Sequence, residues 1–163
     1  MAKPKPHIIF AYGTLKRGFP NYALMEDLKT KDDLVFVDTC HTEDPHPLVI
    51  GPHGIGYLIN LPGSGHRVKG EAYAVSDEAL VRLDEIEGVE YGYYERVPVV
   101  VVRDGGERVK AEAYFGHRSF GEILWKMKGE VGLVEYGEKE VREFVRKEHR
   151  PGRKNSILDI LNR

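Results

Sequence analysis

One glutamate stands where a helical pattern predicts an apolar side chain. Residues 76–88, SDEALVRLDEIEG, begin with a serine and two acids, as is typical of a helix N-terminus. At about 100° per residue, four apolar side chains form one stripe, and Glu87 falls inside it. The four are Ala79, Leu80, Leu83 and Ile86. Burial and the negative end of the helix dipole would both raise the pKa of this carboxyl. It could then act as a general acid or base; a solvated glutamate at a frayed helix end is the alternative.

A second stretch, residues 8–18 (IIFAYGTLKRG), joins a strand of the buried type to a small polar turn. Gly13 allows the backbone to turn or to approach a ligand closely. Successive N–H groups in such a turn can form an anion-binding nest, and Lys16 and Arg17 would add positive potential. The glycine spacing is not that of a phosphate-binding P-loop. A plain strand-to-helix turn with solvent-facing cations is the alternative.

The rest of the chain must supply the elements that position these two stretches. Extended segments are predicted at residues 7–12, 34–38, 47–50, 56–60, 68–75, 94–102 and 108–115. Helices are predicted at residues 20–29, 76–88, 120–129 and 137–149. An Asp-Gly-Gly turn at 104–106 predicts a hairpin between the last two strands. Strands outnumber helices without regular alternation, which indicates an α+β fold around a mixed or barrel-like sheet.

Length and composition predict one globular domain. The chain has 163 residues, of which 41% are hydrophobic and 31% charged. A net charge of −2 gives no overall attraction for nucleic acid or a membrane, so neither is an expected partner. Cys40 is the only cysteine, and the N-terminus lacks a secretory pattern; we expect a cytoplasmic protein. The domain is expected over residues 1–145, followed by a basic tail over residues 146–163 with a possible short helix from Ser156.

Three motifs in order resemble the γ-glutamylcyclotransferase-like superfamily, especially its γ-glutamylamine cyclotransferase and avirulence-induced-gene branch. They are YGTLKRG after the first strand, the block over residues 45–75, and LDEIEG followed by YYERV. The resemblance runs from about residue 8 to residue 100. It implies a small mixed β-barrel flanked by helices, with a cavity at one barrel end and no metal or cofactor. The implied reaction cyclises the glutamyl group of a γ-glutamyl derivative to 5-oxoproline and releases the amine.

The resemblance also implies roles for particular residues. Glu87, which the helix pattern had already distinguished, transfers the proton. The glutamyl group is held by backbone amides of Tyr12, Gly13, Thr14 and Leu15.

Two aromatic positions of the implied cavity are ambiguous. The spacer after Glu87 is one residue longer than in the vertebrate enzymes, so Tyr94 is expected to line the cavity with Tyr93 as the alternative. A further pocket aromatic corresponds to Tyr114 or Phe115, because the alignment slips by one residue there.

Other polar residues are expected to have structural roles. Arg96 is predicted to form an ion pair, Asp84 and Glu85 to be solvated helix charges, and Cys40 to be a buried small residue rather than a nucleophile. Three histidines and an acid near the third strand match no common metal-ligand spacing, so no metal site is expected. These are His41, His46, His53 and Asp44.

The leading functional hypothesis is cyclisation of γ-glutamyl amines such as γ-glutamyl-ε-lysine. One alternative is the same chemistry on γ-glutamyl dipeptides. Another, from a different class, is a catalytically idle ligand-binding or stress-response module. The sequence leaves the oligomeric state open.

Overall fold

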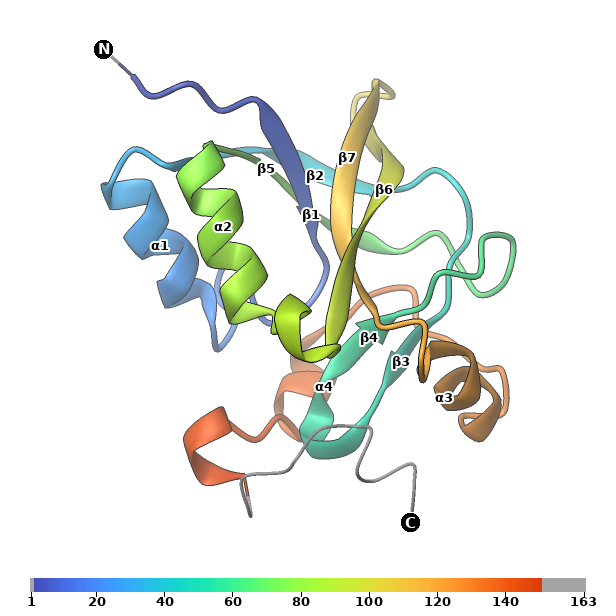
Figure 1. Cartoon of the computed structure of the whole chain (residues 1–163). Coiled ribbons are helices and arrows are strands. Elements are labelled where there is room, and N and C mark those ends of the chain that lie inside the picture. Colours follow the sequence, from blue (N-terminus) through green and yellow to red (C-terminus); the bar gives the residue numbers. More distant parts are fainter. Residues whose placement is uncertain (1, 151–163) are drawn as a thin grey trace.

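A closed barrel forms the centre of the molecule. The structure, a computed structural model, describes residues 2–150 (Figure 1). Within them, seven strands form one sheet in the order β1-β5-β2-β6-β7-β4-β3, and pairing of β1 with β7 closes the first five into a barrel. The strands are β1 (His7–Ala11), β2 (Leu34–Thr42), β3 (Leu48–Ile50), β4 (Gly56–Leu58), β5 (Lys69–Val75), β6 (Tyr94–Arg103) and β7 (Arg108–Gly116). The predicted α+β fold with a small mixed barrel is confirmed.

Side-chain alternation along β1 separates two parts of the core. Phe10 belongs to the cluster inside the barrel, whereas its neighbours Ile9 and Ala11 belong to the cluster under the helices. β5 alternates in the same way, with Ala72 inside and Tyr73 under the helices. Because successive side chains of a strand point to opposite faces, strands covered on both sides need apolar residues throughout.

Four α-helices flank the sheet in the described part of the chain. They are α1 (Tyr22–Thr30), α2 (Asp77–Ile86), α3 (Gly121–Met127) and α4 (Glu138–Val141). In Figure 1, α1 and α2 lie side by side against one side of the barrel, and α3 lies near β3 and β4. Met25 and Leu28 of α1 and Leu83 of α2 are buried in the cluster they share with the barrel. Burying each such side chain stabilises the fold by about 1.5–3 kcal/mol.

The predicted hairpin between β6 and β7 is present. Val102 pairs with Arg108, and Gly106 takes a positive φ of 98°. The Gly106 N–H donates to the carbonyl of Arg103 at 2.7 Å. Glycine adopts such a left-handed conformation without strain because it has no Cβ.

The helix predicted over residues 137–149 was too long. Only one turn, α4, is α-helical. The chain then contacts the turn between β3 and β4, where the Val145 N–H donates to the His53 carbonyl at 2.8 Å. This tertiary hydrogen bond replaces the next helical one. A short 3-10 turn, η3 (Lys147–His149), follows. The expected helix from Ser156 lies outside the described residues.

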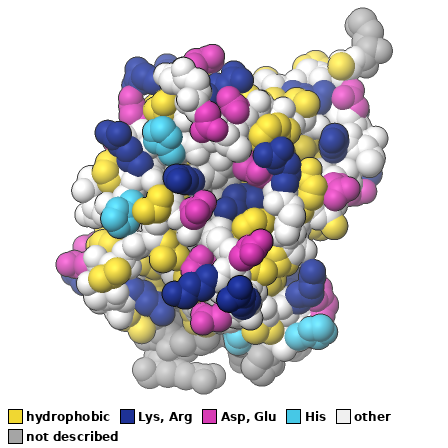
Figure 2. Space-filling view, turned by 180° about the vertical axis from the view of Figure 1, so that it is seen from behind, with side chains coloured by type: hydrophobic (Ala, Val, Ile, Leu, Met, Phe, Trp, Pro, Cys, Tyr) yellow, Lys and Arg dark blue, Asp and Glu magenta, His cyan; other side chains and the backbone are white. Residues whose placement is uncertain are grey.

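The surface of the described residues mixes both signs of charge. Figure 2 shows basic and acidic side chains interspersed over one face of the molecule. None of the helices over residues 2–150 combines the length and the apolar character that a bilayer crossing requires.

Candidate active site

A pocket opens at one end of the barrel. Its walls come from the turn after β1, the end of α2, the turn between β3 and β4, the start of β6 and a segment after α4. It encloses about 490 Å³, its open mouth included. The two stretches distinguished in the sequence, around Gly13 and Glu87, are therefore brought together in one cavity.

Local signals at both ends of α2 place Glu87 in this pocket. The Ser76 hydroxyl accepts the Ala79 N–H at 3.1 Å and caps the helix start. At the other end, the Glu87 N–H still donates to Leu83 O at 2.9 Å, and Gly88 then takes the left-handed conformation, with φ 65°. A Cβ on residue 88 would overlap the Tyr93 ring, so glycine fits here for two reasons.

The environment of Glu87 suits proton transfer. Its side chain lines the pocket and keeps a path to solvent, yet the protein packed around it is dense, and this burial raises the pKa of the carboxyl to about 7. No side chain in residues 2–150 forms a hydrogen bond with it. At neutral pH the protonated and ionised forms are both populated, as a group that takes and returns a proton requires.

The turn after β1 lines the pocket and contains unpaired backbone donors. Within the described chain, the N–H groups of Gly13, Thr14 and Leu15 donate to no acceptor. Asn21 fixes the turn, because its backbone N–H and its side-chain amide donate to the carbonyl and the hydroxyl of Thr14, both at 2.9 Å. Gly13 and Thr14 are half-buried and Leu15 is buried, and a fixed row of successive unpaired N–H groups is suited to binding an anion.

Gly13 has a simpler role than the sequence suggested. Its φ is not among the positive values of the chain, so the turn itself does not require glycine. A Cβ at this position would meet no atom within 4 Å. The sequence offered two reasons for a glycine at this position, backbone turning and close approach of a ligand. Only the second is compatible with the structure, because the missing side chain leaves the space beside the amides open.

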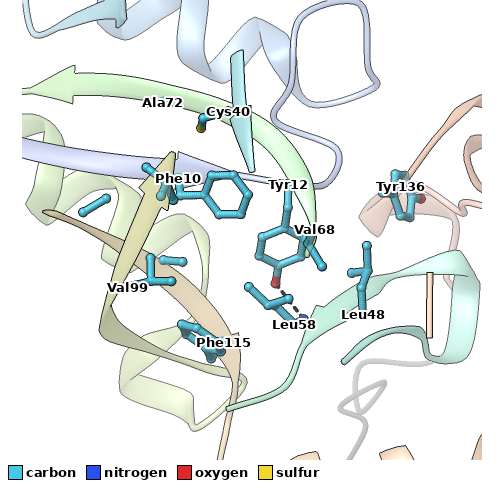
Figure 3. Packing of buried hydrophobic residues seen from close by; sticks show 13 residues of the cluster. Phe10, Tyr12, Cys40, Leu48, Leu58, Val68, Ala72, Val99, Phe115 and Tyr136 are labelled. Atoms are coloured by element: carbon cyan, nitrogen blue, oxygen red, sulfur yellow. Dashed lines mark hydrogen bonds between the residues drawn. The ribbon is translucent and has the colours of Figure 1, made fainter. Parts of the chain in front are cut away.

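The Tyr12 side chain supports the turn from within the barrel. Figure 3 shows its ring between Phe10 and Val68, with the hydroxyl beside Leu58. That hydroxyl donates to the carbonyl of Tyr114 at 2.7 Å and accepts the Leu58 N–H at 3.1 Å. The Tyr12 backbone borders the pocket while its side chain holds β1 to β7 and β4.

Neither cation of the YGTLKRG motif lines the pocket, and the solvent-facing alternative for Lys16 is also wrong. Lys16 is 7% exposed, and its ammonium donates to the Tyr136 carbonyl at 2.6 Å. Arg17 pairs with Glu71 at 2.8 Å and covers the Phe36 ring at 3.9 Å. Both side chains stabilise the turn from outside the cavity, so the turn can bind an anion only through its backbone N–H groups.

The structure resolves the two ambiguous aromatic positions. Tyr94 lines the pocket, stacks on Tyr57 with ring centroids 5.1 Å apart, and donates its hydroxyl to Gly56 O at 3.0 Å. Tyr93 instead packs against the end of α2.

At the other position, Tyr114 lines the pocket. Phe115 is fully buried inside the barrel.

An ion-pair chain behind Tyr114 includes a residue that sequence reasoning missed. The predicted ion pair of Arg96 is confirmed, with Asp84 at 3.1 Å and Glu112 at 3.3 Å. The prediction that Asp84 is only a solvated charge was wrong, because it also accepts the Tyr114 hydroxyl at 2.7 Å. Asp84 lies outside the apolar stripe of α2, and only the tertiary position of β7 reveals its role. Glu85 is exposed as expected.

Phe144 is a pocket residue that the sequence did not indicate. It lies well beyond residue 100, where the motif resemblance ends, and an isolated phenylalanine in a polar segment carries no specific signal.

Comparisons with known proteins identify the family of this chain and relatives of its fold. The profile of a family described as gamma-glutamyl cyclotransferase, AIG2-like, matches residues 9–131. A protein of Arabidopsis thaliana provisionally named a gamma-glutamylcyclotransferase is 41% identical over 157 residues, covering 88% of this chain and 84% of that protein. The gamma-glutamylaminecyclotransferase of Bos taurus is 44% identical over 98 residues, covering 60% of this chain and 57% of its own length. A crystal structure of an AIG2-like protein from Mus musculus has a TM-score of 0.74 at 33% identity and covers 88% of this chain and 98% of that one.

Proposed function

Because this chain belongs to the AIG2-like family of gamma-glutamyl cyclotransferases, we propose that it cyclises the glutamyl group of γ-glutamyl amines to 5-oxoproline. The free amine, for example lysine from γ-glutamyl-ε-lysine, is the second product. The observation that carries this proposal is the position of Glu87, whose pKa burial raises to about 7, in the same pocket as a row of unpaired amides.

Glu87 is the proposed proton carrier. The substrate's α-ammonium must lose a proton before its nitrogen can attack the γ-carbonyl carbon, and the Glu87 carboxylate accepts that proton. The C–N bond of the five-membered ring then forms, giving a tetrahedral intermediate. The protonated Glu87 donates to the departing nitrogen as the bond to the amine breaks. Glu87 then takes the second proton from the nitrogen of the new ring and passes it to the released amine, which leaves as an ammonium ion. General acid–base catalysis of this kind contributes about 10²–10⁴-fold.

The row of amides is the proposed binding site for the glutamyl α-carboxylate. Backbone N–H groups bind an anion without a charged side chain, which fits the turn of residues 12–15 because Lys16 and Arg17 face elsewhere. Fixing the α-carboxylate leaves few rotations between the α-nitrogen and the γ-carbonyl. Since the attack is intramolecular, most of the acceleration comes from this restriction. Tyr94 is the proposed side-chain contact for the substrate.

The test is release of 5-oxoproline from a panel of γ-glutamyl amines and γ-glutamyl dipeptides. We expect turnover of the amines, and a loss of about 10²-fold or more in kcat for Glu87→Gln, which has the same shape but cannot carry the proton. Glu85→Gln is the matched control, because Glu85 lies on the same helix, is exposed and is outside the pocket.

The other possible results of this test would favour a different function or contradict the mechanism. Turnover of dipeptides alone would favour the dipeptide cyclotransferase, and binding without any turnover would favour the idle ligand-binding module. Full activity of Glu87→Gln would contradict the mechanism.

A further inference from the structure

The C-terminal part of the described chain, residues 133–150, contributes Phe144 to the lining of the pocket. The Val145 N–H donates to the His53 carbonyl at 2.8 Å, and the Tyr136 hydroxyl donates to a carbonyl of the same turn at 2.7 Å. These bonds hold the segment against the turn between β3 and β4. They bring Phe144 into the lining of the pocket.

Arg150 is folded back onto this segment. Its guanidinium carbon lies 5.5 Å from the centre of the Phe144 ring, and its Nε donates to Val145 O at 2.8 Å. Burial raises the pKa values of Tyr57 and Tyr94, and the positive charge of Arg150 opposes both rises, which places the guanidinium within Coulombic range of both hydroxyls. A positive charge thus lies near the pocket on the side formed by the C-terminal segment.

We propose that Phe144 and Arg150 form a subsite for the leaving amine and favour amines that carry a carboxylate. This inference rests on the proposed function, which places the glutamyl end of the substrate at the amide row and Glu87. The amine then extends toward Ile55 and Phe144, which line the same pocket. The Phe144 ring packs on the aliphatic part of the amine, and Arg150 binds the carboxylate beyond it.

The chemistry of the subsite separates two classes of amine. A guanidinium binds a carboxylate through charge-assisted hydrogen bonds, which two parallel N–H groups can make together. A diamine of the same length presents an ammonium group there without a carboxylate to balance it, and like charges repel. Amino acids linked through a side-chain amine are therefore the favoured leaving groups, and simple diamines the disfavoured ones.

Two substrates that differ in one carboxylate test the inference. γ-Glutamyl-ε-lysine and γ-glutamylcadaverine have the same chain and the same terminal ammonium, but only the first carries a carboxylate. We expect the wild-type protein to have the larger kcat/KM on the lysine derivative. In Arg150→Gln, the ratio of the two kcat/KM values should fall about tenfold, mainly through a higher KM for the lysine derivative. Arg150→Lys should keep part of the preference, because the charge remains without the planar fork.

Arg142→Gln is the matched control, because it removes one exposed positive charge from the same segment outside the pocket. An unchanged substrate ratio in Arg150→Gln, with both substrates still turned over, would contradict the subsite and leave the proposed function intact. Absence of 5-oxoproline from both substrates with the wild-type protein would contradict the proposed function, and the subsite with it. Equal loss of the ratio in Arg142→Gln would show a general field effect and would overturn the assignment to Arg150.

Discussion

The burial of Glu87 gives its carboxyl a pKa suited to proton transfer, and the same burial makes its ionised form costly for stability. A carboxyl that is densely packed and lacks a partner cation loses hydration, and this raises its pKa to about 7. Tyr12, Tyr94 and Tyr114 line the same pocket, and each hydroxyl donates to another acceptor: two backbone carbonyls and Asp84. Since these hydroxyls are already engaged, none stabilises the ionised form of Glu87. The pKa of Glu87 therefore stays raised, because the three hydroxyls donate to other acceptors and not to its carboxylate.

Gly13 provides a test of the amide row at the residue scale. In Gly13→Val, the added side chain would fill the open space beside the N–H groups, whereas the φ at this position is one that valine can adopt. We expect kcat/KM to fall about 10- to 100-fold, with a higher KM, because the glutamyl group can no longer reach its position. Steady-state kinetics on γ-glutamyl-ε-lysine measure the effect.

Two controls accompany this prediction. Gly13→Ala should give a smaller loss, because one methyl group fills less of the space. Chemical unfolding should show both variants within about 0.5 kcal/mol of the wild type, as is usual for substitutions without a clash. An unchanged KM and kcat in Gly13→Val would contradict the role of the turn.

At the scale of elements, α2 is the part of the site that its own sequence specifies most fully. Ser76 begins the helix, Gly88 ends it, and the apolar stripe fixes which side packs on the barrel, so the inward direction of Glu87 could be predicted. These signals are local, each depending on residues within a few positions. The full length of β2, which continues to Thr42, could not be predicted, because it depends on pairing with both β5 and β6.

Substitution of Gly88 tests how the end of α2 positions the carboxylate. In Gly88→Ala the Cβ would overlap the Tyr93 ring in addition to occupying a left-handed conformation. We expect the free energy of unfolding to fall by about 2–3 kcal/mol. The activity of the folded fraction should fall as well, because Glu87 is the adjacent residue. Urea unfolding and kcat below the transition measure the two effects.

Gly92 supplies the matched control for this prediction. It also has a positive φ, of 75°, but a Cβ there would meet no atom within 4 Å. Gly92→Ala should therefore show only the conformational cost of about 1–2 kcal/mol and an unchanged kcat. Equal stability and activity in the two variants would mean that the contact with Tyr93 does not position the helix end.

At the scale of the whole molecule, the pocket joins segments from most of the chain. The turn after β1 and the end of α2 could be predicted from composition, spacing and motif resemblance. The contributions of Asp84, Lys16 and Phe144 could not, because each depends on a partner at least 12 positions away in sequence. A barrel was expected, but the pairing of β1 with β7 that closes it was not, since pairing between distant strands has no local signal.

The raised pKa of Glu87 should also be visible in the stability of the whole molecule. An unfolded glutamate titrates near 4.5, and the folded one near 7. Between these values the folded state binds more protons than the unfolded state, so stability falls as pH rises from about 4.5 to 7 and is constant beyond it. The full shift would correspond to about 3 kcal/mol, and access of solvent to the carboxylate reduces this to about 1–3 kcal/mol.

Glu87→Gln removes this titration and leaves the other groups in place. The difference in free energy of unfolding between Glu87→Gln and the wild type should therefore be about 1–3 kcal/mol more favourable to the variant at pH 8 than at pH 4.5. Urea unfolding of both proteins at the two pH values measures it, with the exposed Glu85→Gln as the control that shows no such change. A difference that does not depend on pH would mean that Glu87 titrates normally in the folded protein. Since a normal carboxylate is a weak base at neutral pH, that result would also remove the physical basis of the proposed proton transfer.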